Sequence, residues 1–433
     1  MTLDLASLRA RLIAAPLARV SGRLAQAVGP LLEADVPAAA LGSLWRLEGG
    51  GLCEVVGFRE RRALLMPLEA AEGVAFGASL RHVTDALAAG VGDALLGRTI
   101  DALGRPLDSR PAPETTARRK VDGPPPPALR RARITEALPT GVRVLDGLAT
   151  LGRGQRIAIL AGSGVGKSTL LGMIARNTQV DVNVICLVGE RGREVREFIE
   201  GNLGPEGLAR SVLVVATSDQ SPALQVKAPF VATTIAEAFR DAGKQVLLVV
   251  DSLTRLALAQ RQIGLAAGEP PTTRGFTPSV FALLPRLLER AGPGDGEGAV
   301  TAVYTVLIEG DDVHDPVGDA VRGIVDGHIV LSRKLAMHNH YPAVDVLASL
   351  SRLMDRITTP AHRALAAKAR DLLATWAENE ELVRLGAYRR GSSPAVDEAI
   401  DKMPGLQAFL QQGAEATSFA SVQAGLAKAI GAS

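Results

Sequence analysis

The chain of 433 residues is poor in the residue types that mark several large protein classes. Aromatic residues make up 3% and the formal net charge is +2, which argues against a general nucleic-acid binder, because such proteins need basic surfaces and stacking platforms. The only two cysteines, Cys53 and Cys186, are far apart and form no metal-type pair, as expected in a reducing compartment. His338 and His340 have no acidic or cysteine partner at metal-ligand spacing, so we expect no metal site there.

Long apolar runs are scarce as well. No stretch approaches the ~18 uninterrupted apolar residues of a membrane helix. The N-terminus carries Asp4, Arg9 and Arg11, where a secretory signal needs an apolar core. We therefore expect a protein of the cytoplasm whose contact with a membrane is peripheral.

The most informative pattern is QRIAILAGSGVGKSTLL, from Gln155 to Leu171. An apolar strand leads into a glycine-rich loop, and Lys167 then opens a helix. Such a loop wraps a phosphate with inward-pointing N–H groups, and the helix N-terminus adds its partial positive charge. Lys167 can reach the β- and γ-phosphates of ATP, and the Ser168 hydroxyl can hold Mg²⁺. The predicted nucleotide-binding residues are Gly162, Ser163, Gly164, Val165, Gly166, Lys167, Ser168 and Thr169.

Two further apolar runs end in charged residues. QVLLVVDS ends in Asp251, which has the form of a Walker B carboxylate that supports Mg²⁺ through water or through Ser168. An Asp here also fits as the cap of the next helix. LVGERGREV places Glu190 and Arg191 after another buried strand, where a water-positioning carboxylate and a γ-phosphate arginine are expected. Taken alone, that run also fits a solvated helix N-terminus.

The length and the pattern of the chain predict several domains. Short β-type runs separated by Gly and Pro predict a small β-barrel, and four consecutive prolines mark an extended linker. Continuous apolar runs alternating with helices then predict an α/β domain with a parallel sheet, its site at the carboxyl ends of the strands. An Ala- and Leu-rich helical domain follows. The expected boundaries are 17–92 for the barrel, 93–135 for the linker, 136–355 for the α/β domain and 356–433 for the helical domain.

Residues 1–16 are expected to form a separate helix ahead of the barrel. Leu5, Leu8 and Leu12 share one stripe, with Arg9 and Arg11 off it. Such a helix is either a docking arm for a partner or a lid on the first domain. Isolated helices below ~12–15 residues are marginal in water, so the apolar stripe needs a surface to cover. If that surface belongs to a partner, the helix is an arm that the fold does not need.

Several segments carry a more specific resemblance. GERGREV, ATSDQSP, GLAAGEPPTTRG, YTVLIEGDD, DGHIVLSR and YPAVDVLASLSR occur in this order. Together they resemble the ATPases that energise flagellar and virulence type III protein export, which are related to the catalytic subunit of rotary F-type ATP synthases. The resemblance runs from about Gly97 to Tyr388 and implies a RecA-like P-loop domain. Ala161 stands where the P-loop pattern has its first glycine, and the export family often carries alanine there.

The resemblance also implies roles for individual residues. Glu190 would polarise the attacking water, and Arg191 would contact the γ-phosphate. Tyr341 would stack on the adenine, which we favour over an ordinary half-buried tyrosine ahead of a proline. Arg352 would be an arginine finger reaching the site of a neighbouring subunit, a contribution on the order of 10³–10⁵ in rate in comparable enzymes. Such a finger requires a ring, and the resemblance implies a homohexamer.

The function implied is an Mg-ATP hydrolase that energises the unloading and export of proteins through a flagellar or type III apparatus, with the flagellar one favoured. The implied partners are other copies of the chain, a stator-like regulator at the N-terminal helix, a central stalk protein, the export gate, and export chaperones with their substrates. No nucleic acid is expected. The implied location is the cytoplasm, peripheral at the inner face of the cytoplasmic membrane.

Three alternatives stay open. Virulence secretion shares nearly all of these motifs. The catalytic subunit of a rotary ATP synthase would share the nucleotide residues, but GERGREV, EGDD and Ala161 favour export, and the C-terminal region has no DELSEED-like acidic segment. An RNA-translocating hexameric helicase has the same core, and the low aromatic content and near-neutral charge argue against it.

Overall fold

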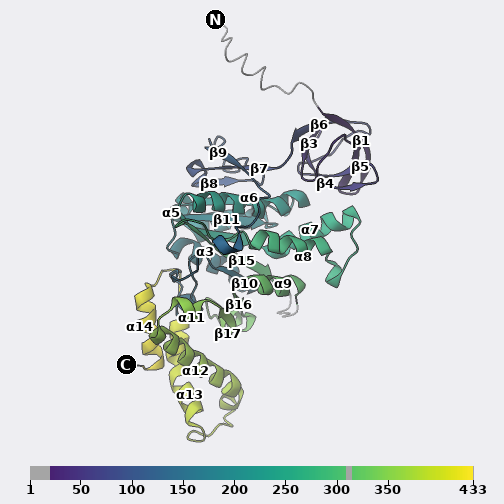
Figure 1. Cartoon of the computed structure of the whole chain (residues 1–433). Helices are drawn as coiled ribbons and strands as arrows, with labels where there is room; N and C mark the ends of the chain where they lie inside the picture. The colour runs from purple at the N-terminus through teal and green to yellow at the C-terminus, as the bar shows by residue number, and fades with distance from the viewer. Residues whose placement is uncertain (1–19, 309–314, 433) are drawn as a thin grey trace. The chain divides into compact units, whose positions relative to one another are not determined.

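The computed structural model describes residues 20–308 and 315–432, and the helix expected over residues 1–16 lies outside them. The chain divides into two compact units. The smaller one runs to Leu87 and includes the short segments 221–223 and 262–270. The larger one holds the rest of the chain (Figure 1).

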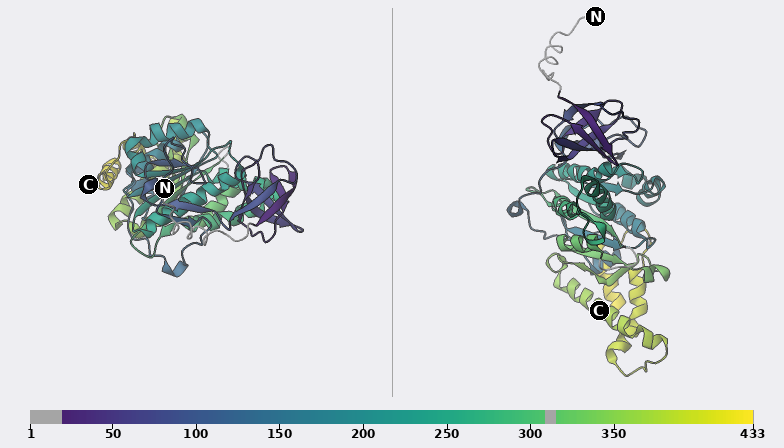
Figure 2. Two further views of the ribbon diagram at one scale, coloured as in Figure 1. Left: turned by 90° about the horizontal axis from the view of Figure 1, so that it is seen from above. Right: turned by 90° about the vertical axis from the view of Figure 1, so that its right-hand side faces the viewer.

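The smaller unit is a closed barrel, drawn in dark purple in Figure 2. Alternate side chains of its strands fill the interior with Leu32, Trp45, Leu65 and Leu80, each 6% exposed or less. The Trp45 indole N–H donates to the Ser43 hydroxyl over 3.0 Å, so this large ring is buried without losing a hydrogen bond. The strand order around the barrel is β1 (Ser21–Val28), β2 (Leu31–Asp35), β5 (Arg62–Pro67), β4 (Leu52–Arg59), β3 (Leu44–Leu47) and β6 (Ser79–Thr84), which returns to β1.

The larger unit is built on a mainly parallel sheet. Its central strands are continuous apolar runs, and every residue of VNVICLV is buried, as expected when helices cover both faces. The order across the sheet is β17 (Val344–Ser351), β16 (Gly327–Leu331), β10 (Arg156–Ala161), β15 (Ala299–Leu307), β13 (Gln245–Asp251), β11 (Val182–Val188), β12 (Ser211–Ala216) and β8 (Arg98–Ile100), with β14 (Gly292–Pro293) beside β15. Among the pairs of described strands, β16–β17 and β14–β15 are antiparallel, and the other pairs of this sheet are parallel.

Helices connect these strands (Figure 1). Their sequences are rich in straight-chain and small residues, which have a high helix propensity. They are α2 (Arg143–Leu148), α3 (Lys167–Asn177), α4 (Gly192–Glu197), the π-helix η3 (Phe198–Leu203), α5 (Gly204–Ala209), α6 (Pro222–Asp241), α7 (Leu253–Ala267), α8 (Pro278–Leu288), α9 (Pro316–Ile324), α10 (Arg333–Met337) and α11 (Met354–Ile357), with short 3₁₀ turns η1 (Asp93–Leu95), η2 (Ala128–Arg130) and η4 (Thr273–Gly275).

The C-terminal helices are α12 (Pro360–Arg384), α13 (Pro394–Leu410) and α14 (Phe419–Ile430). They lie beyond the β16 and β17 end of the sheet (Figure 1). Their apolar faces join the core of the sheet domain, because Leu372, Leu406 and Leu426 belong to the same buried cluster as Ile159 and Leu171. The predicted order of barrel, parallel-sheet domain and helical region is thereby confirmed. None of the helices described is both long enough and apolar enough to cross a bilayer.

Part of the segment expected as a linker belongs to regular structure. Arg98–Ile100 is the edge strand β8, parallel to β12, and its Arg98 side chain forms an ion pair of 2.7 Å with Asp108. Further on, β9 (Ala117–Lys120) pairs with β7 (Ala88–Val91). Strands of three or four residues carry too little periodicity to stand out in a sequence. The domain boundaries themselves stay a prediction.

Candidate nucleotide-binding and catalytic site

The glycine-rich loop joins β10 to α3, where the sequence predicts it. Gly164 and Gly166 have φ values of +75° and +87°, which glycine adopts at little cost. At Gly166 the absence of a side chain is also a matter of space, because a Cβ there would lie 3.2 Å from Cε1 of Tyr341. The Tyr341 ring therefore lies close to the loop at the residue that precedes α3.

Lys167, the first residue of α3, lies between two carboxylates. Its ammonium forms an ion pair with Asp251 and lies 3.8 Å from Oε1 of Glu190. Asp251 ends β13, is 3% exposed, and also accepts a hydrogen bond of 2.7 Å from the Thr305 hydroxyl of β15. These residues come together because β10, β15, β13 and β11 are consecutive in the sheet, and the carboxyl ends of parallel strands lie on the same side of it.

Glu190 follows β11 and is shielded from water, its side chain being 13% exposed. Burial raises its pKa, and a hydrogen bond to Glu194 and the charge of Asp251 act in the same direction, whereas Lys167 opposes them. The hydrogen bond from Glu190 in turn lowers the pKa of Glu194. The pKa values of the two carboxyl groups are thus pushed apart, as is common for acidic pairs in active sites.

The structure bears on the two interpretations of Asp251. The N-terminal hydrogen bond of α7 comes from Ser252, whose hydroxyl accepts the Arg255 N–H over 3.3 Å, so Asp251 is not needed as the cap. Its carboxylate instead contacts Lys167 and Thr305. Carboxylate and hydroxyl oxygens are the donors that Mg²⁺ prefers, and Ser168 supplies such a hydroxyl beside Lys167.

A pocket of about 420 Å³ lies beside the loop. Tyr341 forms one wall, with 40% of its surface exposed and its hydroxyl 3.4 Å from the Ala336 carbonyl oxygen. An aromatic wall next to a phosphate-binding loop suits a flat base. The lining residues are Gly164, Gly166, Thr169, Leu170, Met173, Tyr341, Pro342, Gln412, Gly413 and Ala414.

Two predicted site residues lie apart from this group. The Arg191 side chain is 75% exposed, and its ion-pair partner is Glu194 at 3.6 Å. Arg352 is exposed and follows β17, which runs antiparallel to β16. Its backbone N–H donates to the Asp326 carbonyl oxygen over 3.0 Å, next to the first residue of β10 rather than the last.

Sequence reasoning did not assign three of the residues that the fold brings to the site. Thr305 contacts Asp251 from a neighbouring strand, and Glu194 contacts Glu190 from the first turn of α4. Gln412 lines the pocket beside the loop from a segment more than 240 residues further along the chain. Of the three, Glu194 alone is close in sequence to a predicted site residue, four positions after Glu190.

Comparisons with known protein families agree with this geometry. Residues 141–351 match the pattern of the ATP synthase alpha/beta family, nucleotide-binding domain. Residues 358–428 match that of the T3SS EscN ATPase C-terminal domain. The two matches together span the site and the C-terminal helices.

Individual relatives cover most of the chain. It is 52% identical to the flagellum-specific ATP synthase of Bacillus subtilis over 91% of each chain. It is 53% identical to the type 3 secretion system ATPase of Xanthomonas euvesicatoria, over 90% of this chain and 89% of that one. The solved structure of the assembled ATPase EscN from the enteropathogenic E. coli type III secretion system superposes with a TM-score of 0.91 and 46% identity, over 94% of this chain and 100% of that one. EscN in complex with its central stalk EscO gives a TM-score of 0.88 at 46% identity, with the same coverage.

Proposed function

This chain belongs to the ATP synthase alpha/beta family, among the ATPases of flagellar and type III protein export, and on that premise we propose that it works as a homohexameric ring whose ATP sites are shared between neighbours. It is an ATP hydrolase. The proposed work of hydrolysis is the unloading and export of proteins through a secretion apparatus.

In the proposed mechanism, the loop from Gly162 to Thr169 holds the phosphates of ATP and Lys167 neutralises their charge. Glu190, 3.8 Å from Lys167, orients the water that attacks the γ-phosphate in line. The oxygens of Ser168 and Asp251 would hold Mg²⁺, which supplies charge neutralisation at the phosphates. Arg191 starts exposed and would swing onto the γ-phosphate, and Tyr341 would cover the adenine face.

One observation carries the shared-site proposal. Arg352 and the phosphate loop lie at opposite ends of the parallel strands of one sheet. The loop follows Ala161, the last residue of β10, whereas Arg352 lies beside Asp326, whose carboxylate accepts a hydrogen bond of 3.1 Å from the backbone N–H of Arg156 at the start of β10. The five residue steps from Arg156 to Ala161 cover about 17 Å of strand. That is farther than an arginine side chain can span.

Arg352 therefore serves hydrolysis only on another copy of the chain. A head-to-tail interface, in which the loop edge of one copy faces the Arg352 edge of the next, closes into a ring when the rotation permits. The assembled form of EscN supports this choice of a ring, and the resemblance to export ATPases supports six copies.

Further partners are proposed on the same basis. The EscN complex with EscO supports a central stalk protein. We assign a stator-like regulator to residues 1–16, and an export gate, chaperones and export substrates to the ring as a whole. The location is then cytoplasmic, peripheral at the inner face of the cytoplasmic membrane. Flagellar export is the first candidate, and the relatives from virulence systems make type III secretion the second. Loss of motility or loss of effector secretion after gene deletion distinguishes the two.

The concentration dependence of activity tests the shared site. ATPase activity should rise more than linearly with protein concentration, so that specific activity increases across a dilution series, because a lone copy lacks the Arg352 that completes its site. Light scattering on the same dilution series reports the assembly state. A fully active monomer would refute the proposal.

A further inference from the structure

The base pocket has a wall that comes from far along the chain. Gln412 and Gly413 follow the end of α13 and line the same pocket as Tyr341. The Gln412 backbone N–H donates to the Tyr341 carbonyl oxygen over 2.9 Å. Two short segments, 338–342 and 410–414, are thereby joined side by side, and we refer to them as the pocket wall.

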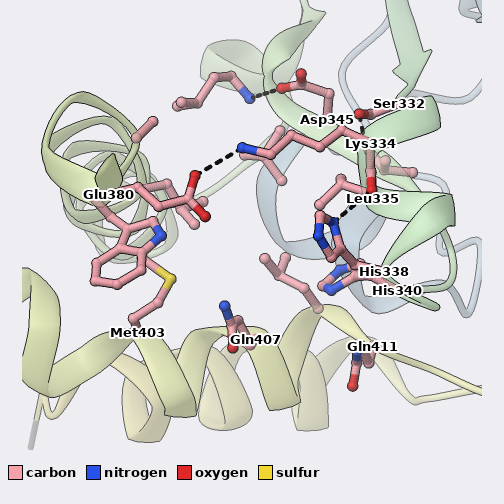
Figure 3. Close-up of a pocket in the computed structure, with 17 residues that line it drawn as sticks. Ser332, Lys334, Leu335, His338, His340, Asp345, Glu380, Met403, Gln407 and Gln411 are labelled. Atoms are coloured by element: carbon pink, nitrogen blue, oxygen red, sulfur yellow. Dashed lines mark hydrogen bonds and ion pairs between the residues drawn. The ribbon is translucent and has the colours of Figure 1, made fainter. Parts of the chain in front are cut away.

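The pocket wall is thin, because a second pocket of about 430 Å³ lies behind it. Figure 3 shows that pocket, with His338 and His340 on one side and Gln411 on the α13 side. Neighbouring residues of the wall thus line different pockets: His340 and Gln411 line the rear one, whereas Tyr341 and Gln412 line the base pocket. Leu410 fixes one end of the wall in the buried core, and beyond Leu410 hydrogen bonds hold the wall in place.

The Gln412 side chain supplies three of these bonds, beside those that the side chains of Arg143 and Asn177 donate to the carbonyl oxygens of Gln411 and Ala414. Its amide N–H groups donate to the carbonyl oxygens of Gly141 over 2.8 Å and of Glu415 over 2.7 Å. Its amide oxygen accepts the Arg143 N–H over 2.7 Å. All three partners are backbone groups, so one side chain ties the end of α13 to the start of α2.

The anchor at the other end is rigid. The N–H of Gly141 donates to the fully buried Asp146 carboxylate over 2.9 Å, and its carbonyl oxygen also accepts the Thr417 N–H over 3.1 Å. Gly141 has a φ of +73°, and a Cβ there would lie 2.8 Å from Cβ of Asn177. This close approach holds the anchor against the C-terminal end of α3, the helix that begins at the phosphate loop.

We propose that Gln412 is a positioning residue for the nucleobase: its side chain holds the pocket wall, and through it Tyr341, at the spacing that a purine ring requires. The inference rests on the proposed function, in which ATP binds with its base in this pocket. Gln412 itself acts through the wall and not on the phosphates. Its contribution is therefore confined to ligands that carry a base.

The experiment therefore compares a ligand that carries a base with one that does not. ATPase kinetics are measured for the full chain and for Gln412→Ala, with inorganic tripolyphosphate as a competitor that has phosphates but no base. Loss of one or two net hydrogen bonds should raise the KM for ATP roughly five- to thirtyfold. The kcat and the inhibition constant of tripolyphosphate should stay within about twofold, because interactions equal in the ground and transition states change KM alone.

Two variants serve as comparisons. Gln411→Ala is the matched control, since the same side chain is removed from the neighbouring position that lines the rear pocket, and its KM should equal that of the wild type. Gln412→Glu keeps the size but brings a carboxylate toward the carbonyl oxygens of Gly141 and Glu415, so its KM should rise at least as much as that of Gln412→Ala. A Glu variant with wild-type KM would mean that bulk, not bonding, holds the wall, and would overturn the inference.

Other outcomes are equally decisive. Equal weakening of ATP and tripolyphosphate by Gln412→Ala would mean that the substitution disturbs the phosphate loop, and the positioning role would be wrong. A Gln412→Ala variant that matches Gln411→Ala would also refute it. If the wild type itself binds ATP no better than tripolyphosphate, the base pocket of the proposed function fails, and this inference fails with it.

Discussion

Glu190 and Lys167 are neighbours in the site, yet their replacement should affect different steps of the reaction. Glu190→Gln should retain ATP binding and lose turnover, because the carboxylate matters while water attacks. Lys167→Ala should weaken binding itself, because the ammonium already neutralises phosphate charge in the ground state. The two side chains lie 3.8 Å apart, so a change in general accessibility or folding would affect both alike.

The sizes of these effects follow from the contacts. Glutamine has the size of glutamate and can donate to Glu194, so the Kd for ATP should change by no more than about twofold, whereas kcat should fall roughly 10²–10⁴-fold. Loss of the Lys167 contact to a phosphate, a charge-assisted hydrogen bond, should raise the Kd for ATP about ten- to hundredfold.

Lys167→Ala also leaves Asp251 buried with Thr305 as its remaining side-chain hydrogen-bond partner in the described structure. The cost to the free energy of unfolding can reach about 3–5 kcal/mol, as for other broken buried pairs. Thermal unfolding without nucleotide therefore accompanies the assay, which consists of steady-state ATPase rates and titration with labelled nucleotide. Hydrolysis at the wild-type rate by Glu190→Gln would refute the assignment, and so would unchanged ATP affinity in folded Lys167→Ala.

Two predictions concern stability. Burial raises the pKa of Asp146 to about 6 from its ordinary 3.8, so the folded chain binds this proton more tightly than the unfolded chain does. The protonated Asp146 therefore stabilises the folded chain fully below pH 3.8, and this stabilisation is lost as the pH rises through about 6. The melting temperature of the wild type should fall relative to that of Asp146→Asn between roughly pH 4 and pH 7. Parallel curves for the two proteins would contradict this. Arg290 is fully buried and binds both carboxylate oxygens of Glu237, at 2.9 and 2.6 Å. Arg290→Ala should lower the free energy of unfolding by about 3–5 kcal/mol in denaturant titrations, and Arg290→Met combined with Glu237→Leu should cost less; equal costs would show that the lost charge pairing is not the cause.

The sequence predicted the local parts of this structure well. The strand, loop and helix around Lys167 depend on residues adjacent in the chain, and β10 and α3 lie where the pattern expects them. The placement of Asp251 at the end of a buried strand is local in the same sense. The parallel sheet could be predicted because its strands are continuous apolar runs.

The rest depends on contacts between distant residues. Gln412 meets Gly141 and Arg143 across about 270 positions, and no periodicity marks a side chain that bonds to backbone groups. The short strand β8 was predicted as linker because three residues carry no pattern. The edge on which Arg352 lies follows from the antiparallel direction of β17, which only the pairing of β16 with β17 defines.

The central claim, that each ATP site is completed by the neighbouring copy, is tested most directly by mixing two inactive variants. Lys167→Ala lacks a working phosphate loop, and Arg352→Ala lacks the arginine at the opposite edge. In rings formed at random from equal amounts, roughly a quarter of the interfaces pair an intact loop with an intact Arg352. The account predicts that the mixture regains ATPase activity toward that fraction of the wild-type value once subunits have exchanged. A mixture that stays as inactive as its two components, with mixed rings verified by differential tagging, would contradict it.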